Sequence, residues 1–135
     1  MKQPKEIIQW MLSRDAFSAW MNIDVRKIEK GNCTLSCKVS PQMLNGFDIL
    51  HGGITYSLSD SALAFAANSY GHKCVSIETS ISHLRSVKNG QVLTIRANEI
   101  HRGKTIGVYQ VDIINDENKL VSKFKGTVHI SQEIW

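Results

Sequence analysis

The residues with the clearest chemical potential lie in the stretch LNGFDILHGGITYSLSDSALAFAANS, residues 44–69. Asp60 is the one carboxylate in its helix-length run of small and apolar residues, and no lysine or arginine lies a turn away to neutralise it. An ionised carboxylate in apolar surroundings is costly unless it has a partner, or its pKa rises until it holds a proton. Asp60 is therefore a candidate general base or nucleophile. The alternative is an acid on an exposed helix edge, or one that bonds to Ser57, Ser59 or Ser61.

Two glycines, Gly52 and Gly53, directly precede this run. A helix that begins there has free backbone N–H groups at the positive end of its dipole, and glycine leaves room for a ligand oxygen to approach. Such an N–H group can polarise a carbonyl and hold the oxyanion that forms when the carbonyl is attacked. The alternative is a plain turn, since two glycines before a helix often only let the chain bend.

Gly52 and Asp60 cannot serve the same carbonyl from one chain. They are eight residues apart in the sequence, which corresponds to about 12 Å along an α-helix. A general base and an oxyanion donor must both lie within about 3 Å of the reacting group. If both act, they come from two copies of the chain, and the substrate lies at a symmetric dimer interface.

The elements that must position these residues follow from the hydrophobic pattern. We expect an N-terminal amphipathic helix within residues 1–21 and a central helix over about 53–70, which is apolar or small nearly all round and must be covered on most sides. Strands are expected over about 22–29, 32–40, 73–84, 91–101, 104–116 and 119–131. The sequence therefore predicts one α+β domain, residues 1–135, with a mostly antiparallel sheet wrapped around the central helix.

The composition predicts a globular protein in a reducing compartment. With 42% hydrophobic and 21% charged residues, the chain of 135 residues has no disorder signature and no apolar run long enough to cross a bilayer. Cys33 and Cys37 share one face of an expected strand with apolar residues, which favours core packing. We expect a soluble, cytoplasmic protein without a membrane partner, because charged residues interrupt the apolar positions near the N-terminus.

The charge pattern gives no sign of a nucleic-acid partner. The net charge is +4, but the basic residues are dispersed and no nucleic-acid motif accompanies them. A mild basic excess also suits a ligand that carries phosphates. The histidines are scattered without the spacing of a metal site, so no metal is expected. They are His51, His72, His83, His101 and His129.

Seven residues of the central stretch form one ordered motif: Asn45, Gly46, His51, Gly52, Gly53, Asp60 and Asn68. This motif closely resembles that of hotdog-fold acyl-CoA thioesterases, specifically the PaaI-like branch linked to phenylacetic acid degradation. The order of elements also agrees, from about residue 22 to 131. The resemblance implies the hotdog fold, a long central helix wrapped by an antiparallel sheet, in which two chains form a continuous sheet. We therefore expect a homodimer, and a homotetramer built from two such pairs.

The resemblance also implies roles for the site residues. The aspartate that matches Asp60 attacks the thioester carbonyl or activates water for that attack, and the N–H group that matches Gly52, from the other chain, polarises the carbonyl. Asn45 matches an asparagine that positions the aspartate or the water. His51 matches a histidine that orients the thioester. Ser76 falls where some relatives keep a serine or threonine near the attacking water.

Basic residues in two turns are candidates for binding the phosphates of coenzyme A. Arg85 and Lys88 lie in the first turn, and Arg102 and Lys104 lie in a hairpin turn like those that meet these phosphates in the family. The alternative is that these side chains are only solvated. Gly53 is also expected at the substrate. No cofactor is implied, because coenzyme A is part of the substrate and a thioester already has a good leaving group.

The prediction is an acyl-CoA thioesterase that releases free acid and coenzyme A, with the acyl group undetermined. Two alternatives on the same scaffold stay open. One is a hydroxyacyl dehydratase that uses His51 as its acid-base group, and the other is a non-catalytic module that only binds acyl-CoA. The candidates for shaping the acyl pocket are Phe47, Ile49, Leu50, Tyr56, Leu63 and Phe65.

Overall fold

The computed structural model describes all 135 residues, and every predicted strand and the central helix are present. In chain order the elements are α1 (Pro4–Arg14), α2 (Ala16–Trp20), β1 (Asp24–Glu29), β2 (Asn32–Lys38), η1 (Pro41–Met43), α3 (Gly52–Asn68), β3 (His72–His83), β4 (Val92–Arg102), β5 (Ile106–Ile114) and β6 (Leu120–Ile134). None of the helices combines the length and the apolar character needed to cross a membrane.

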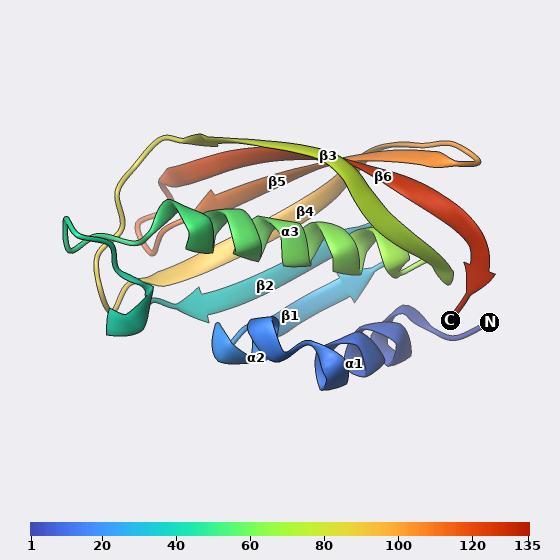
Figure 1. Cartoon of the computed structure of the whole chain (residues 1–135), viewed down its shortest axis with the longest axis horizontal. Helices are drawn as coiled ribbons and strands as arrows, with labels where there is room; N and C mark the ends of the chain where they lie inside the picture. The colour runs from blue at the N-terminus through green and yellow to red at the C-terminus, as the bar shows by residue number, and fades with distance from the viewer.

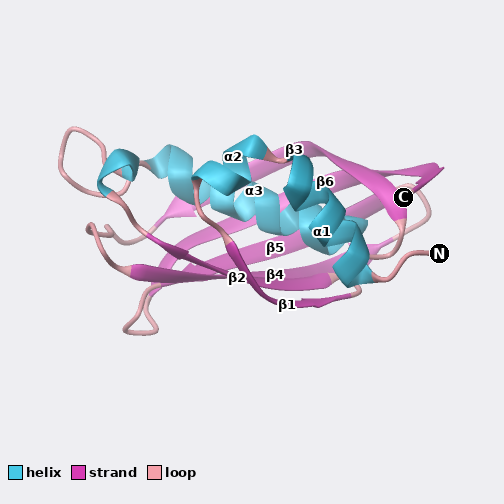
Figure 2. Ribbon diagram, turned by 90° about the horizontal axis from the view of Figure 1, so that it is seen from below, coloured by secondary structure: helices cyan, strands magenta, loops and turns pink.

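One antiparallel sheet of six strands wraps around α3. The strand order is β1-β2-β4-β5-β6-β3, so β1 and β3 are the edge strands. Figure 1 shows α3 lying along the hollow of the curved sheet. In Figure 2, α1 and α2 lie on the same side of the sheet as α3, and α1 contacts both α3 and β1. The predicted α+β architecture is therefore confirmed.

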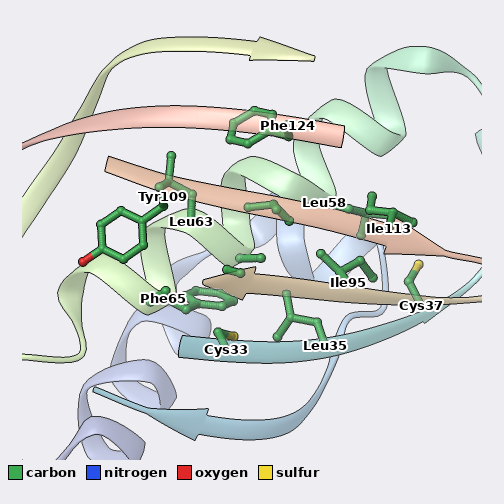
Figure 3. Packing of buried hydrophobic residues seen from close by; sticks show 14 of the residues in the cluster. Cys33, Leu35, Cys37, Leu58, Leu63, Phe65, Ile95, Tyr109, Ile113 and Phe124 are labelled. Carbon is green, nitrogen blue, oxygen red and sulfur yellow. The ribbon is translucent and has the colours of Figure 1, made fainter. Parts of the chain in front are cut away.

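The core forms between the inner face of the sheet and the covered side of α3. Leu58, Leu63 and Phe65 of α3 are almost fully buried against the strands (Figure 3). Cys33 and Cys37 are buried on the same face of β2, as predicted. Burial raises the pKa of Cys33 to about 12 and that of Cys37 to about 11, so both remain thiols that act as small apolar side chains.

One stripe of α3 is not covered by the sheet or by the other helices. Gly53, Ser57, Asp60 and Ala64 recur every three or four residues and are exposed or half-buried, whereas most of the helix is buried. The stripe consists of small residues apart from Asp60. The sequence predicts a helix that needs cover on most sides, and the single protomer leaves this stripe accessible to a partner or a ligand.

The N-terminal segment differs from the single helix that the sequence predicts. The helical segment is interrupted at Asp15, which separates α1 from the short α2. The Asp15 carboxylate accepts hydrogen bonds from the backbone N–H and the hydroxyl of Ser18, at 2.9 and 2.5 Å, and so caps α2. The Ser18 hydroxyl also lies 3.0 Å from the hydroxyl of Ser61, which ties α2 to α3 near Asp60.

One position of β6 also differs from prediction. The alternation of apolar and polar residues over 119–131 predicts that Val121 lies on the solvent-exposed face of the last strand, but Val121 is buried. The backbone N–H groups of Leu84 and Arg85 donate to the Val121 carbonyl at 2.8 and 3.2 Å, so the segment that follows β3 folds over it. This crossing segment builds one wall of the site described below.

Candidate active site

The N-terminus of α3 leaves one of its two glycine amides free. His51 is the N-cap, and its Nδ1 atom accepts a hydrogen bond from the Gly53 N–H at 2.8 Å. A Cβ atom on Gly53 would lie 2.9 Å from that nitrogen, which explains the glycine. The Gly52 N–H has no acceptor among the backbone or side-chain hydrogen bonds. Gly52 is therefore the available donor, and the amide of Gly53 is already engaged.

The Gly52 amide lies in a pocket of about 370 Å³, here called the Gly52 pocket. Its walls come from the loop before α3, the first turn of α3, the end of β3 with the segment after it, and one residue of β6. They are Asn45, Ile49, Leu50, Gly52, Thr55, His83, Leu84, Arg85, Ser86, Val87 and Val121. The Leu50 N–H donates to the Val87 carbonyl at 2.7 Å and holds the two loops together.

Asn45 organises the loop that forms one side of the Gly52 pocket. Its side-chain oxygen accepts hydrogen bonds from the N–H groups of Phe47 and Ile49, at 2.9 and 3.4 Å. This Asx turn leaves the amide nitrogen of Asn45 without a partner in the chain. Asn45 therefore lines the same pocket as Gly52, and it is not brought to Asp60 of the same chain.

Asp60 lies in a second pocket, of about 240 Å³, between α3 and β3. The other residues around this Asp60 pocket are Leu63, Ala64, Cys74, Val75, Ser76 and Val128. Asp60 belongs to none of the five ion pairs of the chain. Burial raises the pKa of its carboxyl group above the ordinary value of 3.8, because desolvation disfavours the charged form and nothing nearby compensates.

The three serines near Asp60 bond to other groups. Ser57 donates to the Gly53 carbonyl at 2.7 Å, and Ser59 donates to the Thr55 carbonyl at 2.8 Å. Ser61 pairs with Ser18 of α2 at 3.0 Å, as described above. The alternative in which a serine satisfies Asp60 is therefore wrong, and the carboxylate is left unpartnered.

Ser76 and Asp60 are brought together, although the sequence places them on different elements. Both line the Asp60 pocket, Ser76 from β3 and Asp60 from α3. Asn45 and Gly52 line the other pocket. Four of the five predicted catalytic residues thus fall into two groups near different parts of α3, as the helix geometry requires for a single chain, and His51 lines neither pocket.

The four predicted coenzyme A contacts have three different settings. Arg85 lines the Gly52 pocket, and Lys88 and Lys104 are exposed in their turns. Arg102 is already engaged at the opposite end of α3, where its guanidinium lies 3.9 Å from the ring centroid of Tyr70 and donates to the Ala67 carbonyl. Arg85 is therefore the one of these four basic residues that lines the Gly52 pocket.

The candidate acyl-pocket residues also divide. Phe65 is only 1% exposed and belongs to the core, so it is unavailable to a ligand, while Phe47 is 83% exposed on its loop. Tyr56 packs on Phe124 with ring centroids 5.5 Å apart, and its hydroxyl contacts that of Thr79. Ile49 and Leu50 line the Gly52 pocket, whereas Leu63 lines the Asp60 pocket.

Two polar residues at the site have no signal in the sequence. His83 at the end of β3 lies over Gly52, and its Nδ1 atom is 3.2 Å from the hydroxyl oxygen of Thr55. His83 and Thr55 are 28 residues apart, and only the fold brings them together.

Asn68 of the motif has a structural role, since its side chain bonds to both backbone groups of Cys74 and joins α3 to β3.

The structure gathers no group of three His, Cys, Asp or Glu side chains suited to hold a metal ion. The chemistry available from the described groups is that of a carboxylate base or nucleophile and a backbone N–H donor. The absence of a metal and of a cofactor from the reaction stays a prediction.

The chain is similar to known proteins over nearly its full length. The profile of the Thioesterase superfamily matches residues 47–122. Acyl-coenzyme A thioesterase PaaI of Escherichia coli is 38% identical over 88% of this chain and 85% of its own. The solved structure of the E. coli PaaI protein superposes with a TM-score of 0.94 and 34% identity, and the match covers 97% of this chain and 95% of that one.

Two further relatives extend the comparison. Human acyl-coenzyme A thioesterase 13 is 28% identical over 93% of each chain. A hypothetical thioesterase of Streptococcus pneumoniae, solved with coenzyme A, has a TM-score of 0.88 and 31% identity over 94% of this chain and 99% of its own. Variants of that thioesterase were also solved in which one aspartate, or one threonine sixteen positions later, is changed to alanine. The predicted fold and the predicted enzyme class, thioester hydrolase, are thereby confirmed. The chain belongs to the Thioesterase superfamily and is a PaaI-like member with the hotdog fold.

Proposed function

We propose that this protein hydrolyses acyl-CoA thioesters to a free acid and coenzyme A, with Asp60 of one protomer and the Gly52 N–H of the other at each active site. The observation that carries the proposal is that both groups are unsatisfied within the chain. Asp60 is a half-buried carboxylate without an ion pair, and the Gly52 N–H has no acceptor. Groups left in this state are expected where a substrate supplies the missing partner.

The edge strand β3 is the surface through which we expect two protomers to pair. β3 bonds to β6 on one side only, and Val75 and Ile77 on it are 65% and 59% exposed. An unpaired strand with exposed apolar side chains is a template for a second strand. Val75 and Ser76 also line the Asp60 pocket, so a partner at this edge would lie beside Asp60.

Two-fold symmetry would complete the site. A two-fold axis beside β3 makes the partner's α3 run in the opposite direction, which brings its N-terminus toward the middle of the first helix. Gly52 of the partner subunit would then approach Asp60 across the interface. Gly52 and Asp60 of one chain stay about 12 Å apart along the helix, but Gly52 of one chain and Asp60 of the other can then meet at the same carbonyl.

The chemical steps need only these groups and water. In one route the ionised Asp60 takes a proton from water as the oxygen attacks the thioester carbon, and the Gly52 N–H holds the oxyanion. The oxyanion then collapses, the carbon–sulfur bond breaks, and the thiolate of coenzyme A takes up the proton. In the other route the Asp60 carboxylate attacks the thioester carbon, the carbon–sulfur bond breaks, and the thiolate of coenzyme A leaves. Water then hydrolyses the resulting anhydride to the free acid, restores Asp60, and supplies the proton that the thiolate takes up. Both routes require Asp60 in its charged form.

Ser76 is proposed to bind the attacking water. It shares the Asp60 pocket and follows Asp60 by sixteen residues. The aspartate and threonine changed in the S. pneumoniae thioesterase have the same separation. A hydroxyl can both donate to and accept from a water molecule, so Ser76 can orient it toward the carbonyl carbon.

Acyl-CoA is the proposed substrate because the relatives named above are acyl-coenzyme A thioesterases or were solved with coenzyme A. Arg85 at the Gly52 pocket is suited to the phosphates. The dehydratase alternative is disfavoured, because Nδ1 of His51 is already used to cap α3. A module that only binds acyl-CoA would not need an unpaired carboxylate in its pocket.

The test is thiol release by the purified protein from a panel of aromatic, short, medium and long acyl-CoA thioesters. We expect turnover of at least one of them, and a loss of about 10²–10⁴-fold in kcat for Asp60→Asn, the usual contribution of a general base. Asp48→Asn on the exposed loop before α3 is the matched control and should keep wild-type activity. Tight binding of acyl-CoA without thiol release would instead favour the binding module, and full turnover by Asp60→Asn would exclude the proposed chemistry.

A further inference from the structure

His83 adds a polar atom to the Gly52 pocket that the proposed mechanism does not use. A Cβ atom built on Gly52 would lie 3.2 Å from Nε2 and 3.3 Å from Cε1 of the His83 ring, so this edge of the imidazole faces the glycine. His83 is exposed, and Nε2 makes no hydrogen bond within the chain. A free ring nitrogen therefore lies beside the amide that is proposed to polarise the thioester.

Thr55 determines which nitrogen of the neutral His83 ring carries the hydrogen. The Thr55 hydroxyl donates to the Gly52 carbonyl at 3.0 Å, and its oxygen lies 3.2 Å from Nδ1 of His83. A hydroxyl has a single hydrogen to donate, so in this pair the ring N–H at Nδ1 is the donor and Thr55 the acceptor. In the neutral ring, Nε2 is then an acceptor and requires an N–H or O–H group from a ligand.

We propose that Nε2 of His83 accepts a hydrogen bond from the substrate's pantetheine arm, at the amide N–H nearest the thioester sulfur. The inference rests on the proposed function, because it needs the thioester carbonyl to lie at the Gly52 N–H. Only an ethylene group separates this amide from the sulfur, so it falls beside Gly52 when the carbonyl is bound there. His83 is thus a substrate-binding residue that distinguishes thioesters with this amide from simple alkyl thioesters.

The pocket wall continues from His83 in the direction that an extended arm would take. Leu84, Arg85 and Ser86 follow His83 in the sequence, and all line the same pocket. Arg85 is exposed, so the phosphate-bearing end of the arm can reach it while the amide meets His83. The same arm occurs on acyl carrier proteins, and the shared chemistry is therefore an acylated cysteamine amide.

The test compares two small thioesters that carry the same acyl group. The N-acetylcysteamine thioester has the amide N–H, and the 2-acetoxyethyl thioester has an oxygen in its place. We expect the wild-type protein to favour the amide by about five- to tenfold in kcat/KM, the effect of one hydrogen bond. The same acyl group on coenzyme A and on an acyl carrier protein is assayed in parallel, and the faster of the two identifies the source of the arm.

Three variants assign the preference to His83. His83→Phe keeps a ring without an acceptor, so kcat/KM for the amide thioester should fall about five- to tenfold relative to kcat/KM for the acetoxyethyl thioester, and the preference should disappear. His83→Gln can place its side-chain oxygen near the position of Nε2 and should restore part of the preference. His101→Phe, at another exposed histidine, is the control and should keep the full preference.

Thr55 is a positioning residue in this proposal. Thr55→Val removes the acceptor that holds the ring, and it should reduce the preference for the amide thioester. Thr55→Ser keeps the hydroxyl and should restore the preference, which a purely structural role of the methyl group would not predict.

Two outcomes separate this inference from the proposed function. If the wild-type protein hydrolyses acyl-CoA but His83→Phe keeps the full preference, or loses activity equally on both thioesters, the inference is overturned. If the wild-type protein hydrolyses none of the thioesters, the proposed function itself is overturned.

Discussion

At the scale of single residues, the proposed chemistry depends on the carboxylate of Asp60, whose charged form is disfavoured by burial. Asp60 is half-buried, lacks an ion pair, and its three neighbouring serines bond to other groups. Desolvation therefore raises its pKa above 3.8 without compensation. A carboxylate in this state is a stronger base than one in water, which suits proton abstraction or attack on a thioester.

The pH dependence of activity follows from this shift. Because only the ionised form of Asp60 can act, kcat/KM should fall as the pH falls through the raised pKa of its carboxyl group. The midpoint of this acid limb should lie above 3.8, the ordinary value for an aspartate. The measurement is a pH profile of thiol release over the range in which the protein stays folded. A flat profile down to the unfolding pH would contradict the assignment.

Asp60→Asn should lower the activity of the protein but raise its stability at neutral pH. A pKa raised in the folded protein means that protonated Asp60 favours folding, and that this contribution is lost as the pH rises through the folded pKa. At neutral pH the charged group therefore destabilises the fold, and asparagine removes that penalty. We expect a higher Tm for Asp60→Asn at pH 7, and a difference that narrows as the pH is lowered. Thermal unfolding at several pH values measures both, and a lower Tm at pH 7 would be inconsistent with this account.

At the scale of elements, the site depends on the close contact between α3 and the sheet. Gly126 of β6 faces Leu63 of α3, and a Cβ atom there would lie 2.5 Å from a Leu63 methyl carbon. Leu63 also lines the Asp60 pocket. The glycine therefore permits the approach of β6 to the helix segment that carries Asp60.

Gly126→Ala should destabilise the fold by about 1–3 kcal/mol, the usual effect of overpacking a core. Gly46→Ala is the control, because a Cβ atom there meets nothing within 4 Å, and its stability should change by no more than about 1 kcal/mol. Chemical denaturation of both variants tests the comparison. Equal stability of the two variants would show that β6 does not limit the position of α3.

Most of the elements could be predicted from the sequence, and much of the site could not. Alternation of apolar residues identified the strands, and the run after Gly52 identified α3, because these signals are local. The interruption of the N-terminal helix at Asp15 was not predicted, because an aspartate within a helical pattern is equally compatible with a surface position and with an N-cap. The surroundings of His83 and Val121 could not be predicted, because they depend on the segment after β3 that folds back over β6 and on contacts between residues far apart in the sequence. Asp60 and Gly52 could be proposed as site residues because a charge in an apolar helix and a helix N-terminus are visible in the sequence itself.

At the scale of the whole molecule, one protomer holds two separate pockets at different places along α3. The Gly52 pocket and the Asp60 pocket have no residue in common. The exposed edge of β3 lies beside the Asp60 pocket and offers a pairing surface. The proposed catalyst is therefore the dimer, and activity should depend on protein concentration wherever the dimer dissociates.

A charge at this edge should separate the protomers. Ile77→Lys on β3 should shift the protein toward the monomer in sedimentation velocity, with loss of thiol release, because the lysine would be desolvated between two strands. Ile100→Lys on β4 is the matched control, since Ile77 and Ile100 are each 59% exposed but β4 is not an edge strand. A dimeric and active Ile77→Lys variant would exclude pairing through β3.

In the proposed dimer, each active site takes Asp60 from one chain and the Gly52 N–H from the other. Two variants each remove one of these two groups. Asp60→Asn removes the carboxylate, and Gly52→Pro removes the N–H at a helix position that tolerates proline. His51, with φ −62° and ψ 133°, already has the extended conformation that proline requires of the residue before it.

The decisive measurement is thiol release after equal amounts of the two variants are unfolded together and refolded, with each variant refolded alone as the control. Each alone should be nearly inactive. The mixture should recover about a quarter of the wild-type activity, because half of the randomly formed dimers hold one intact site of two. If the mixture stays as inactive as the separate variants although mixed dimers have formed, the two groups do not meet across an interface and the account is wrong.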